Sequence, residues 1–267
     1  GMTGGEPLMK IDRVTGYIRL LKKAFGKRFH IHLYTNGTLA TDENLKKLHD
    51  AGLDELRIHM NKEAVKKALK FPNWSVGMEV PCLPGRENEL FELVDYLESA
   101  GAQFLNLNEL EFSDRNVEPM EGLGFALRSD SLTAVDGSRE TADAVLEYAR
   151  GKKLSVHFCT ARLKLDCQLR NRLINRANSV RKPFEKVTAN GFLRKGVVEA
   201  GDLEKAVDEL KGLNVPAGMI FVNAKARRIE ISEEAARAVA GKTKLKVAVI
   251  DEYPSAEPWD WEKTPLN

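Results

Sequence analysis

A short loop at the start of the chain combines residue types that suit the binding of a small charged ligand. Residues 3–8 read Thr-Gly-Gly-Glu-Pro-Leu. Gly4 and Gly5 have no Cβ, so the backbone there can approach a ligand closely. Glu6 carries an acceptor-only carboxylate at neutral pH, and Pro7 suits the first position of a helix. The loop could therefore receive the ammonium group of an amino acid, although the same residues also make an ordinary turn.

Polar side chains recur where the later strands are expected to end. Strand patterns cover residues 29–34, 55–60, 75–82, 104–112 and 154–159, and helical patterns separate them. This alternation predicts a parallel sheet with right-handed crossovers, either an open doubly wound sheet or a barrel. Both architectures place ligands at the carboxyl ends of the strands. The residues at these ends are Tyr34, Thr35, Asn36, Arg57, His59, Glu79, Cys82, Asn106, Asn108, Glu109, His157 and Cys159.

Cysteine and histidine form no recognisable motif. Cys82, Cys159 and Cys167 are too few and too scattered for a disulfide framework. Scattered free thiols are typical of a reducing cytosol, so the expected location is cytoplasmic. His30 and His32 alternate along one strand, but the sequence shows no third ligand, and no metal site is predicted.

The composition describes a globular protein of one or two domains. The chain has 267 residues, of which 43% are hydrophobic and 30% are charged. A net charge of +2 is too balanced to indicate nucleic acid or membrane by itself. No apolar run approaches the roughly 20 residues of a membrane span.

One segment, residues 162–182, is strongly basic. Its basic residues are Arg162, Lys164, Arg170, Arg172, Arg176, Arg181 and Lys182, and Asp166 is its one acidic residue. The segment can be interpreted as a solvated helix face. The alternative is an anion site for a phosphorylated substrate or RNA.

The last third of the chain is predicted to form a separate small domain. The boundary is placed after Lys182-Pro183, which gives domains 1–183 and 184–267. A hairpin around Asn190-Gly191, a helix at 202–212 and further strands indicate an α/β or α+β module. No catalytic signature is visible in it.

The first half of the chain resembles a known enzyme superfamily. Gly-Gly-Glu-Pro, a helix, and a strand ending in Thr35-Asn36-Gly37 resemble the second and third units of radical S-adenosylmethionine enzymes. The stretch from Val80-Pro81 to residues 105–109 resembles their fifth and sixth units. The sequence looks most like archaeal proteins related to the pyruvate formate-lyase activating enzyme, over about residues 3–112 with 157–159 as a further strand.

The resemblance implies a partial TIM-like (β/α) barrel of parallel strands that holds S-adenosylmethionine and a 4Fe–4S cluster. Reductive cleavage of S-adenosylmethionine would give a deoxyadenosyl radical that abstracts hydrogen from a small-molecule or other substrate, which the sequence does not identify. Glu6 and its loop would take the methionine ammonium. Arg57 or His59 suits the methionine carboxylate better than Glu79. Asn106, Asn108 and Glu109 would contact ribose or adenine. The full set of expected cofactor-binding residues is Gly4, Gly5, Glu6, Pro7, Asn36, Arg57, His59, Glu79, Asn106, Asn108, Glu109, His157 and Cys159.

One departure from the family pattern is severe, because the Cys-x3-Cys-x2-Cys loop that holds the cluster is missing. The expectation is that the cluster ligands lie upstream and that this chain has no radical activity. A misassigned start codon, a truncated chain or natural degeneration would account for this. The alternative function is a non-catalytic module for a small anion or RNA on the same scaffold. Because the preceding units are missing, the strand at 29–34 is expected to be an open edge, which is covered by the N-terminal segment or by a second copy, or is left prone to aggregation. Pairing or packing between chains is predicted there.

Overall fold

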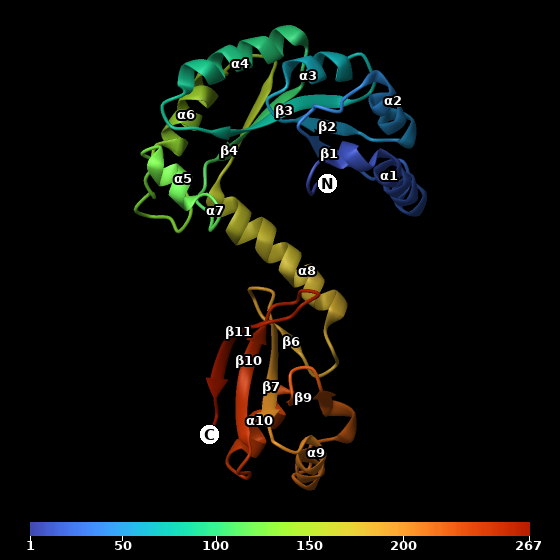
Figure 1. Cartoon of the computed structure of the whole chain (residues 1–267), viewed down its shortest axis with the longest axis vertical. Helices are drawn as coiled ribbons and strands as arrows, with labels where there is room; N and C mark the ends of the chain where they lie inside the picture. The colour runs from blue at the N-terminus through green and yellow to red at the C-terminus, as the bar shows by residue number, and fades with distance from the viewer. The chain divides into compact units, whose positions relative to one another are not determined.

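A five-stranded parallel sheet, with its strands in the order of the sequence, forms the first part of the molecule (Figure 1). Its strands are β1 (His32–Thr35), β2 (Glu55–Ile58), β3 (Ser75–Cys82), β4 (Phe104–Glu109) and β5 (Ser155–Cys159). A doubly wound sheet reverses its strand order at a switch point, whereas an arc of a barrel does not. The predicted α/β class and partial barrel are therefore confirmed in this computed structural model, which describes residues 1–267.

The helices of this unit cover one face of the sheet. They are α1 (Ile11–Phe25), α2 (Asp42–Ala51), α3 (Lys62–Ala68), α4 (Glu87–Ala100) and α6 (Ser138–Tyr148), which Figure 1 shows on the same side. Strand side chains alternate between faces. Leu33, Leu56 and Leu105 point toward the helices and are fully buried. The alternate positions carry Tyr34 and Arg57, so polar groups collect on the face without helices.

The ends of these helices are set by local sequence signals. The side chains of Thr41 and Asn61 accept hydrogen bonds from backbone amides in the first turns of α2 and α3. Gly52 and Gly101 end α2 and α4 in the left-handed region, with φ of 95° and 81°. These caps and stops limit each helix and so fix where the following strand begins.

The free side of β1 is partly covered by the start of the chain. The Met2 amide donates to the His32 carbonyl at 2.7 Å, and the Tyr34 amide donates to the Met2 carbonyl at 3.0 Å. Met2 therefore pairs with Leu33 as a one-residue parallel bridge. This matches one of the two expected ways of covering the edge. Association of two chains through this edge stays a prediction.

Three short segments connect the main elements of the first unit. A 3-10 helix (Pro7–Lys10) precedes α1, α5 (Val117–Gly122) lies in the long segment after β4, and α7 (Ala161–Leu163) follows β5.

None of the helices of the chain combines the length and the apolar character that a membrane crossing requires.

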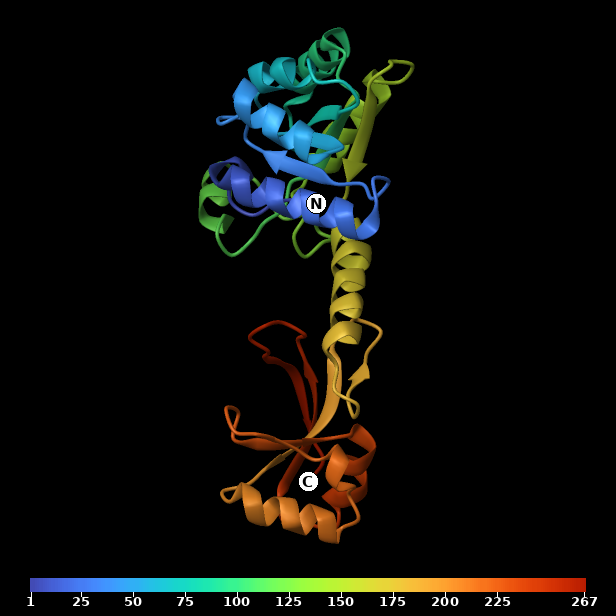
Figure 2. The ribbon, with the colours of Figure 1, turned by 90° about the vertical axis from the view of Figure 1, so that its right-hand side faces the viewer.

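The second unit is an antiparallel sheet with two helices. Its strands are β6 (Lys186–Val187), β7 (Leu193–Glu199), β8 (Phe221–Asn223), β9 (Arg228–Ile231), β10 (Lys246–Glu252) and β11 (Asp260–Pro265). The sheet order is β11-β10-β7-β9-β8, and β6 pairs with β7 across the predicted turn at Asn190-Gly191. Helices α9 (Leu203–Gly212) and α10 (Glu233–Ala240) close the core, which includes Val198 and Leu210 (Figure 2).

The division between the two units differs from the predicted one. The chain divides into residues 1–163 and 164–267, about twenty residues before the predicted boundary at 183/184. A π-helix (Lys164–Leu169) and α8 (Arg170–Val180) belong to the second unit. The reason is packing, because Gly191 lies against Leu173 of α8. In addition, Arg176 Nε donates to the Pro254 carbonyl at 3.3 Å.

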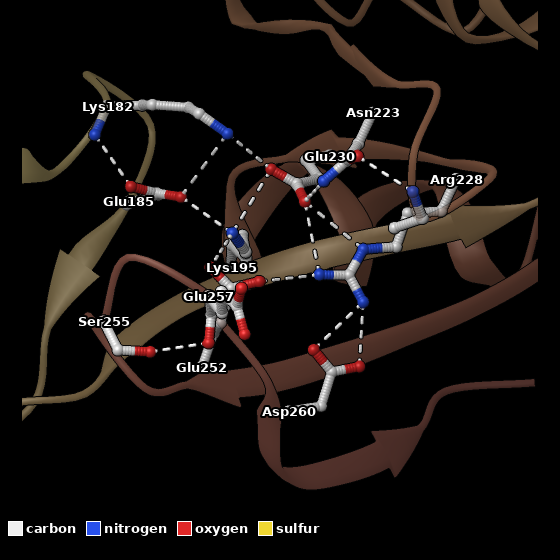
Figure 3. Close-up of polar contacts among 11 residues, drawn as sticks. Lys182, Glu185, Lys195, Asn223, Arg228, Glu230, Glu252, Ser255, Glu257 and Asp260 are labelled. Carbon is white, nitrogen blue, oxygen red and sulfur yellow. Dashed lines mark hydrogen bonds and ion pairs between the residues drawn. The ribbon is translucent and has the colours of Figure 1, made fainter.

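A buried cluster of charges lies inside the second unit (Figure 3). The Lys195 side chain is 1% exposed, and its ammonium donates to Glu185 at 2.9 Å, Glu230 at 3.2 Å and Glu252 at 2.7 Å. Arg228 donates to Glu252 at 2.8 Å. Ions removed from water are tolerated only when paired in this way, so the cluster ties β7, β9 and β10 together.

Acidification is expected to destabilise the second unit through Glu230. Burial acts to raise the Glu230 pKa, but hydrogen bonds from Lys182 and Asn223 and the charge of Lys195 outweigh it and lower the pKa from 4.5 to about 2. Because the folded pKa is depressed, the stabilisation is complete above pH 4.5 and is lost as the pH falls toward 2. It amounts to something on the order of 3 kcal/mol. Urea unfolding measured between pH 6 and pH 2.5 should show this loss.

The matched control is Glu230→Gln, which cannot lose a charge. Its unfolding free energy should be lower at pH 6 and should fall less steeply with acidification. If the unfolding free energy of the two proteins fell equally steeply with pH, the loss could not be attributed to Glu230.

Candidate functional site

A pocket of about 470 Å³ lies at the carboxyl ends of β1 to β4. Its lining residues are Gly5, Glu6, Tyr34, Thr35, Asn36, Arg57, His59, Glu79 and Asn108. All except Tyr34 and Thr35 are among the predicted cofactor-binding residues. They come from separate parts of the sequence, and the parallel sheet brings them to one edge because every strand ends there.

Glu6 joins the opening loop to the end of β1. One carboxylate oxygen accepts from the Leu8 amide at 3.0 Å and from the Thr35 hydroxyl at 2.8 Å. The other accepts from the Asn36 amide at 2.8 Å. Gly4 and Gly5 take positive φ values of 103° and 59°, which residues with a Cβ adopt rarely. The loop is therefore held against the pocket by a single carboxylate.

Replacing Glu6 with alanine is expected to destabilise the first unit by about 1.5–3 kcal/mol, because three donors lose a charged acceptor. The measurement is urea unfolding followed by the fluorescence of Trp74, in a chain whose other tryptophans are replaced with phenylalanine. Glu43→Ala is the matched control, since Glu43 forms an exposed pair with Lys47 in α2. It should cost less than about 0.5 kcal/mol. Similar losses in both variants would contradict the role given to Glu6.

The carboxylate of Glu79 organises the middle of the pocket. It accepts hydrogen bonds from Arg57 at 3.2 Å, Asn106 at 3.2 Å and Asn108 at 3.0 Å. These partners come from the two strands that flank β3. The His59 ring lies 3.1 Å from the Glu79 main-chain carbonyl. Glu79 therefore holds its neighbours in place, and its negative charge is balanced by Arg57.

Arg57 is the principal cation of the pocket. Its Nε donates to Glu55 at 2.5 Å, and its Nη1 donates to the Tyr34 hydroxyl at 2.9 Å as well as to Glu79. Its guanidinium lies 5.3 Å from the Tyr34 ring centroid. Burial and the charge of Glu79 raise the pKa of Tyr34, so this hydroxyl stays protonated at neutral pH. Arg57 Nη2 takes part in none of these bonds.

Glu109 lies outside the pocket. It is 2% exposed, and its carboxylate accepts from Arg128 and, at 2.6 Å, from the Ala161 amide. Burial alternates along β4, so Glu109 points to the face opposite that of Asn106 and Asn108. The alternating Leu-Asn-Leu-Asn-Glu pattern already indicates that Glu109 faces away from the two asparagines. The prediction that Glu109 contacts ribose or adenine did not take this alternation into account.

The remaining predicted residues border the pocket without lining it. His157 pairs in register with Asn106, and Cys159 pairs with Asn108, so both continue the polar face onto β5. Gly4 adjoins Gly5 in the loop, and Pro7 is buried at the start of the 3-10 helix. The roles expected for these residues, and the RNA or phosphate contact expected for residues 162–182, stay predictions.

The cysteines of the first unit do not form a cluster site together. Cys82 is buried, and burial raises the pKa of its thiol to about 12. It pairs across the sheet with Glu109, whereas Cys159 pairs with Asn108. Neighbouring positions point to opposite faces. Cys82 and Cys159 therefore cannot ligate one iron–sulfur cluster.

Tyr34 and Thr35 line the pocket but were not among the predicted cofactor-binding residues. Thr35 matters because its hydroxyl donates to Glu6 and accepts from the Gly37 amide at 3.0 Å. Tyr34 matters because it pairs in register with Arg57. Their position at a strand end was visible in the sequence, but their partners depend on strand register.

Comparison with known proteins agrees with this geometry. The profile of the Radical SAM superfamily matches residues 1–76. A protein of Methanocaldococcus jannaschii named "Putative glycyl-radical enzyme activating enzyme" is 36% identical over 286 residues, which cover 100% of this chain and 75% of the relative. A solved arginine decarboxylase of Paramecium bursaria Chlorella virus aligns with 57% of this chain and 62% of its own, at 11% identity and a TM-score of 0.20. The identity along the whole chain decides the assignment: this chain belongs to the radical SAM superfamily.

Proposed function

We propose that the pocket at the carboxyl ends of β1 to β4 holds the methionine part of S-adenosylmethionine. Membership of the superfamily implies this cofactor together with a 4Fe–4S cluster. The observation that carries the proposal is that Gly5, Glu6, Arg57 and His59 line one cavity. A methionine end carries one ammonium and one carboxylate, and the cavity offers groups of both opposite charges.

The ammonium is assigned to the Glu6 loop. The Glu6 oxygen that accepts from Asn36 keeps acceptor capacity, since each carboxylate oxygen has two lone pairs. Backbone carbonyls of the glycine pair lie next to it in the chain. The positive φ of Gly4 and Gly5 permits the close backbone approach that such contacts need.

The carboxylate is assigned to Arg57, with His59 beside it. Glu55 and Glu79 neutralise and orient the guanidinium from two sides, while Nη2 remains outside those bonds. Charge-assisted bonds of this kind are roughly twice as strong as neutral ones. Asn106 and Asn108 donate their amide N–H to Glu79, so their carbonyl oxygens are left to accept from ribose or adenine.

The chemistry of the superfamily is the abstraction of hydrogen from a substrate. S-adenosylmethionine held in this pocket would be the cofactor for that reaction. By the name of its M. jannaschii relative, the reaction class would be the activation of a glycyl-radical enzyme. We propose this class for the assembled enzyme. In that enzyme, the role of these 267 residues would be to bind S-adenosylmethionine and to hold its ammonium and carboxylate groups in place.

The cluster does not fit the cysteines described above, so no step is assigned through it. We propose that its thiolates come from residues outside these 267, and that the chain alone has no radical activity. The chain spans 75% of the length of its relative, which therefore contains residues that have no counterpart here. Anaerobic reconstitution with iron and sulfide should give no 4Fe–4S absorption and no deoxyadenosine. Cluster-dependent deoxyadenosine from this chain would contradict the proposal.

Binding is tested by saturation-transfer NMR with S-adenosylmethionine, which detects weak ligands. Wild type should show transfer, and Arg57→Met should weaken binding at least tenfold through the loss of a charge-assisted bond. Arg13→Met, in an exposed position of α1, should bind like wild type. Absence of transfer in wild type, or equal transfer in both variants, would count against the proposed site.

A further inference from the structure

Three metal-binding groups meet at the amino ends of β1 and β2, on the polar face of the sheet. His32 and Glu55 are the first residues of their strands and pair in register. His30 lies two residues before His32. Strand side chains two residues apart share a face, so both imidazoles lie on the side of Glu55. One ligand atom from each of the three lies within 4.8 Å of the others.

The spacing is close to what a metal ion requires. His30 Nε2 lies 3.3 Å from one Glu55 oxygen, and the two imidazole centroids are 5.9 Å apart. Tetrahedral zinc with bonds of about 2.0–2.1 Å places its ligand atoms about 3.3 Å apart. The widest gap would therefore have to close by roughly 1.5 Å. The side chain of His30, which is 54% exposed, has the freedom to make that movement and leaves the cluster open to solvent.

Two of the three groups are already oriented. Arg57 Nε donates to one oxygen of Glu55, which leaves the other oxygen for the histidines. His32 packs edge-on against Tyr34, with ring centroids 5.3 Å apart. The hydrogen bond from Arg57 to Glu55 is of the kind that orients metal-ligating carboxylates, and the ring contact restricts the position of His32.

We propose that His30, His32 and Glu55 bind a divalent transition metal ion, with Zn²⁺ as the natural occupant. Two imidazoles and one carboxylate suit zinc and cobalt better than magnesium or calcium, which prefer oxygen ligands. The site adjoins the ligand pocket, whose Tyr34 and Arg57 lie two residues farther along the same strands, and the two are linked by the hydrogen bond from Arg57 to Glu55. It does not depend on the function proposed for that pocket.

Cobalt titration tests the site, with the chain freed of any affinity tag. Wild type should bind one equivalent of Co²⁺ with the visible bands of nitrogen and oxygen ligands, and Zn²⁺ but not Mg²⁺ should displace it. His32→Ala and Glu55→Gln should each weaken binding at least tenfold, while circular dichroism stays unchanged. His49→Gln is the matched control, since His49 lies against Phe71 and Trp74, and it should bind like wild type.

Three outcomes would overturn the site. They are the absence of one-equivalent binding, a thiolate-to-cobalt charge-transfer band that assigns the metal to cysteine, and unchanged affinity in His32→Ala. Saturation transfer from S-adenosylmethionine to the metal-free chain is read separately, so failure of one proposal can be told from failure of the other.

Discussion

Replacing Lys195 with methionine is expected to destabilise the second unit by about 3–5 kcal/mol. The Lys195 side chain is 1% exposed, and its ammonium lies among Glu185, Glu230 and Glu252. Methionine fills a similar volume, so the main loss is the cation and not the packing. Without this partner, the buried carboxylates have lost their hydration and have no ion pair that compensates for it. Lys182 pairs with Glu230, and Arg228 pairs with Glu252. They offset only part of the lost stability, because neither of them contacts all three carboxylates.

The measurement is urea unfolding in a Trp74→Phe background, where both remaining tryptophans belong to the second unit. Lys263→Met is the control, because Lys263 and Glu199 form a pair in which both side chains are more than 40% exposed. It should cost less than about 1 kcal/mol. Adding Glu252→Gln to Lys195→Met should recover part of the loss. Equal costs for the two lysines would contradict the structural role of the cluster.

Gly77→Ala is expected to destabilise the first unit by about 3 kcal/mol, at the upper end of the usual cost of overpacking. Gly77 pairs in register with Phe104 on the neighbouring strand. A Cβ on Gly77 would lie 2.2 Å from the Phe104 carbonyl oxygen and 2.5 Å from its ring. The ring can rotate, but the carbonyl belongs to β4, so the two strands would have to separate. The Arg57 guanidinium lies 5.9 Å from the same ring centroid, and ligand binding should therefore weaken too.

A glycine-to-alanine substitution elsewhere in this unit is expected to stabilise it instead. Gly16 is exposed within α1, and nothing lies within 4 Å of a Cβ built there. Gly16→Ala should stabilise the unit by about 0.5–1 kcal/mol, through better helix propensity. Unfolding followed by Trp74 fluorescence reports on both variants. A destabilisation of less than 1 kcal/mol for Gly77→Ala would show that β3 and β4 adjust more easily than their register indicates.

Much of the pocket could be predicted because its signals are local. The glycine pair and Glu6 are adjacent in the sequence, and caps such as Thr41 and Gly52 mark the helix ends directly. Once each strand is bounded by a helix, its carboxyl end is known. Parallel pairing then brings Asn36, Arg57 and Glu79 together without any knowledge of register.

What could not be predicted depends on register and on contacts distant in sequence. His32 meets Glu55 only because β1 and β2 pair at those positions, so the third group of the proposed metal site was not visible in the sequence. The packing of α8 with the second unit, such as Leu173 against Gly191, joins residues distant in sequence and was not visible either. Lys195 carried an overlooked signal, since it alternates with Leu193 and Val197 on one face of β7, and a lysine on an apolar strand face indicates a paired, buried charge.

The most direct test of the pocket is a crystal structure of this chain soaked with S-adenosylmethionine. We expect the methionine ammonium within hydrogen-bond distance of Glu6 and the carboxylate against Arg57. The nucleoside should extend toward Asn106 and Asn108. Ordered ligand at another place, such as the cavity lined by Pro81 and Leu93, with this pocket empty, would contradict it.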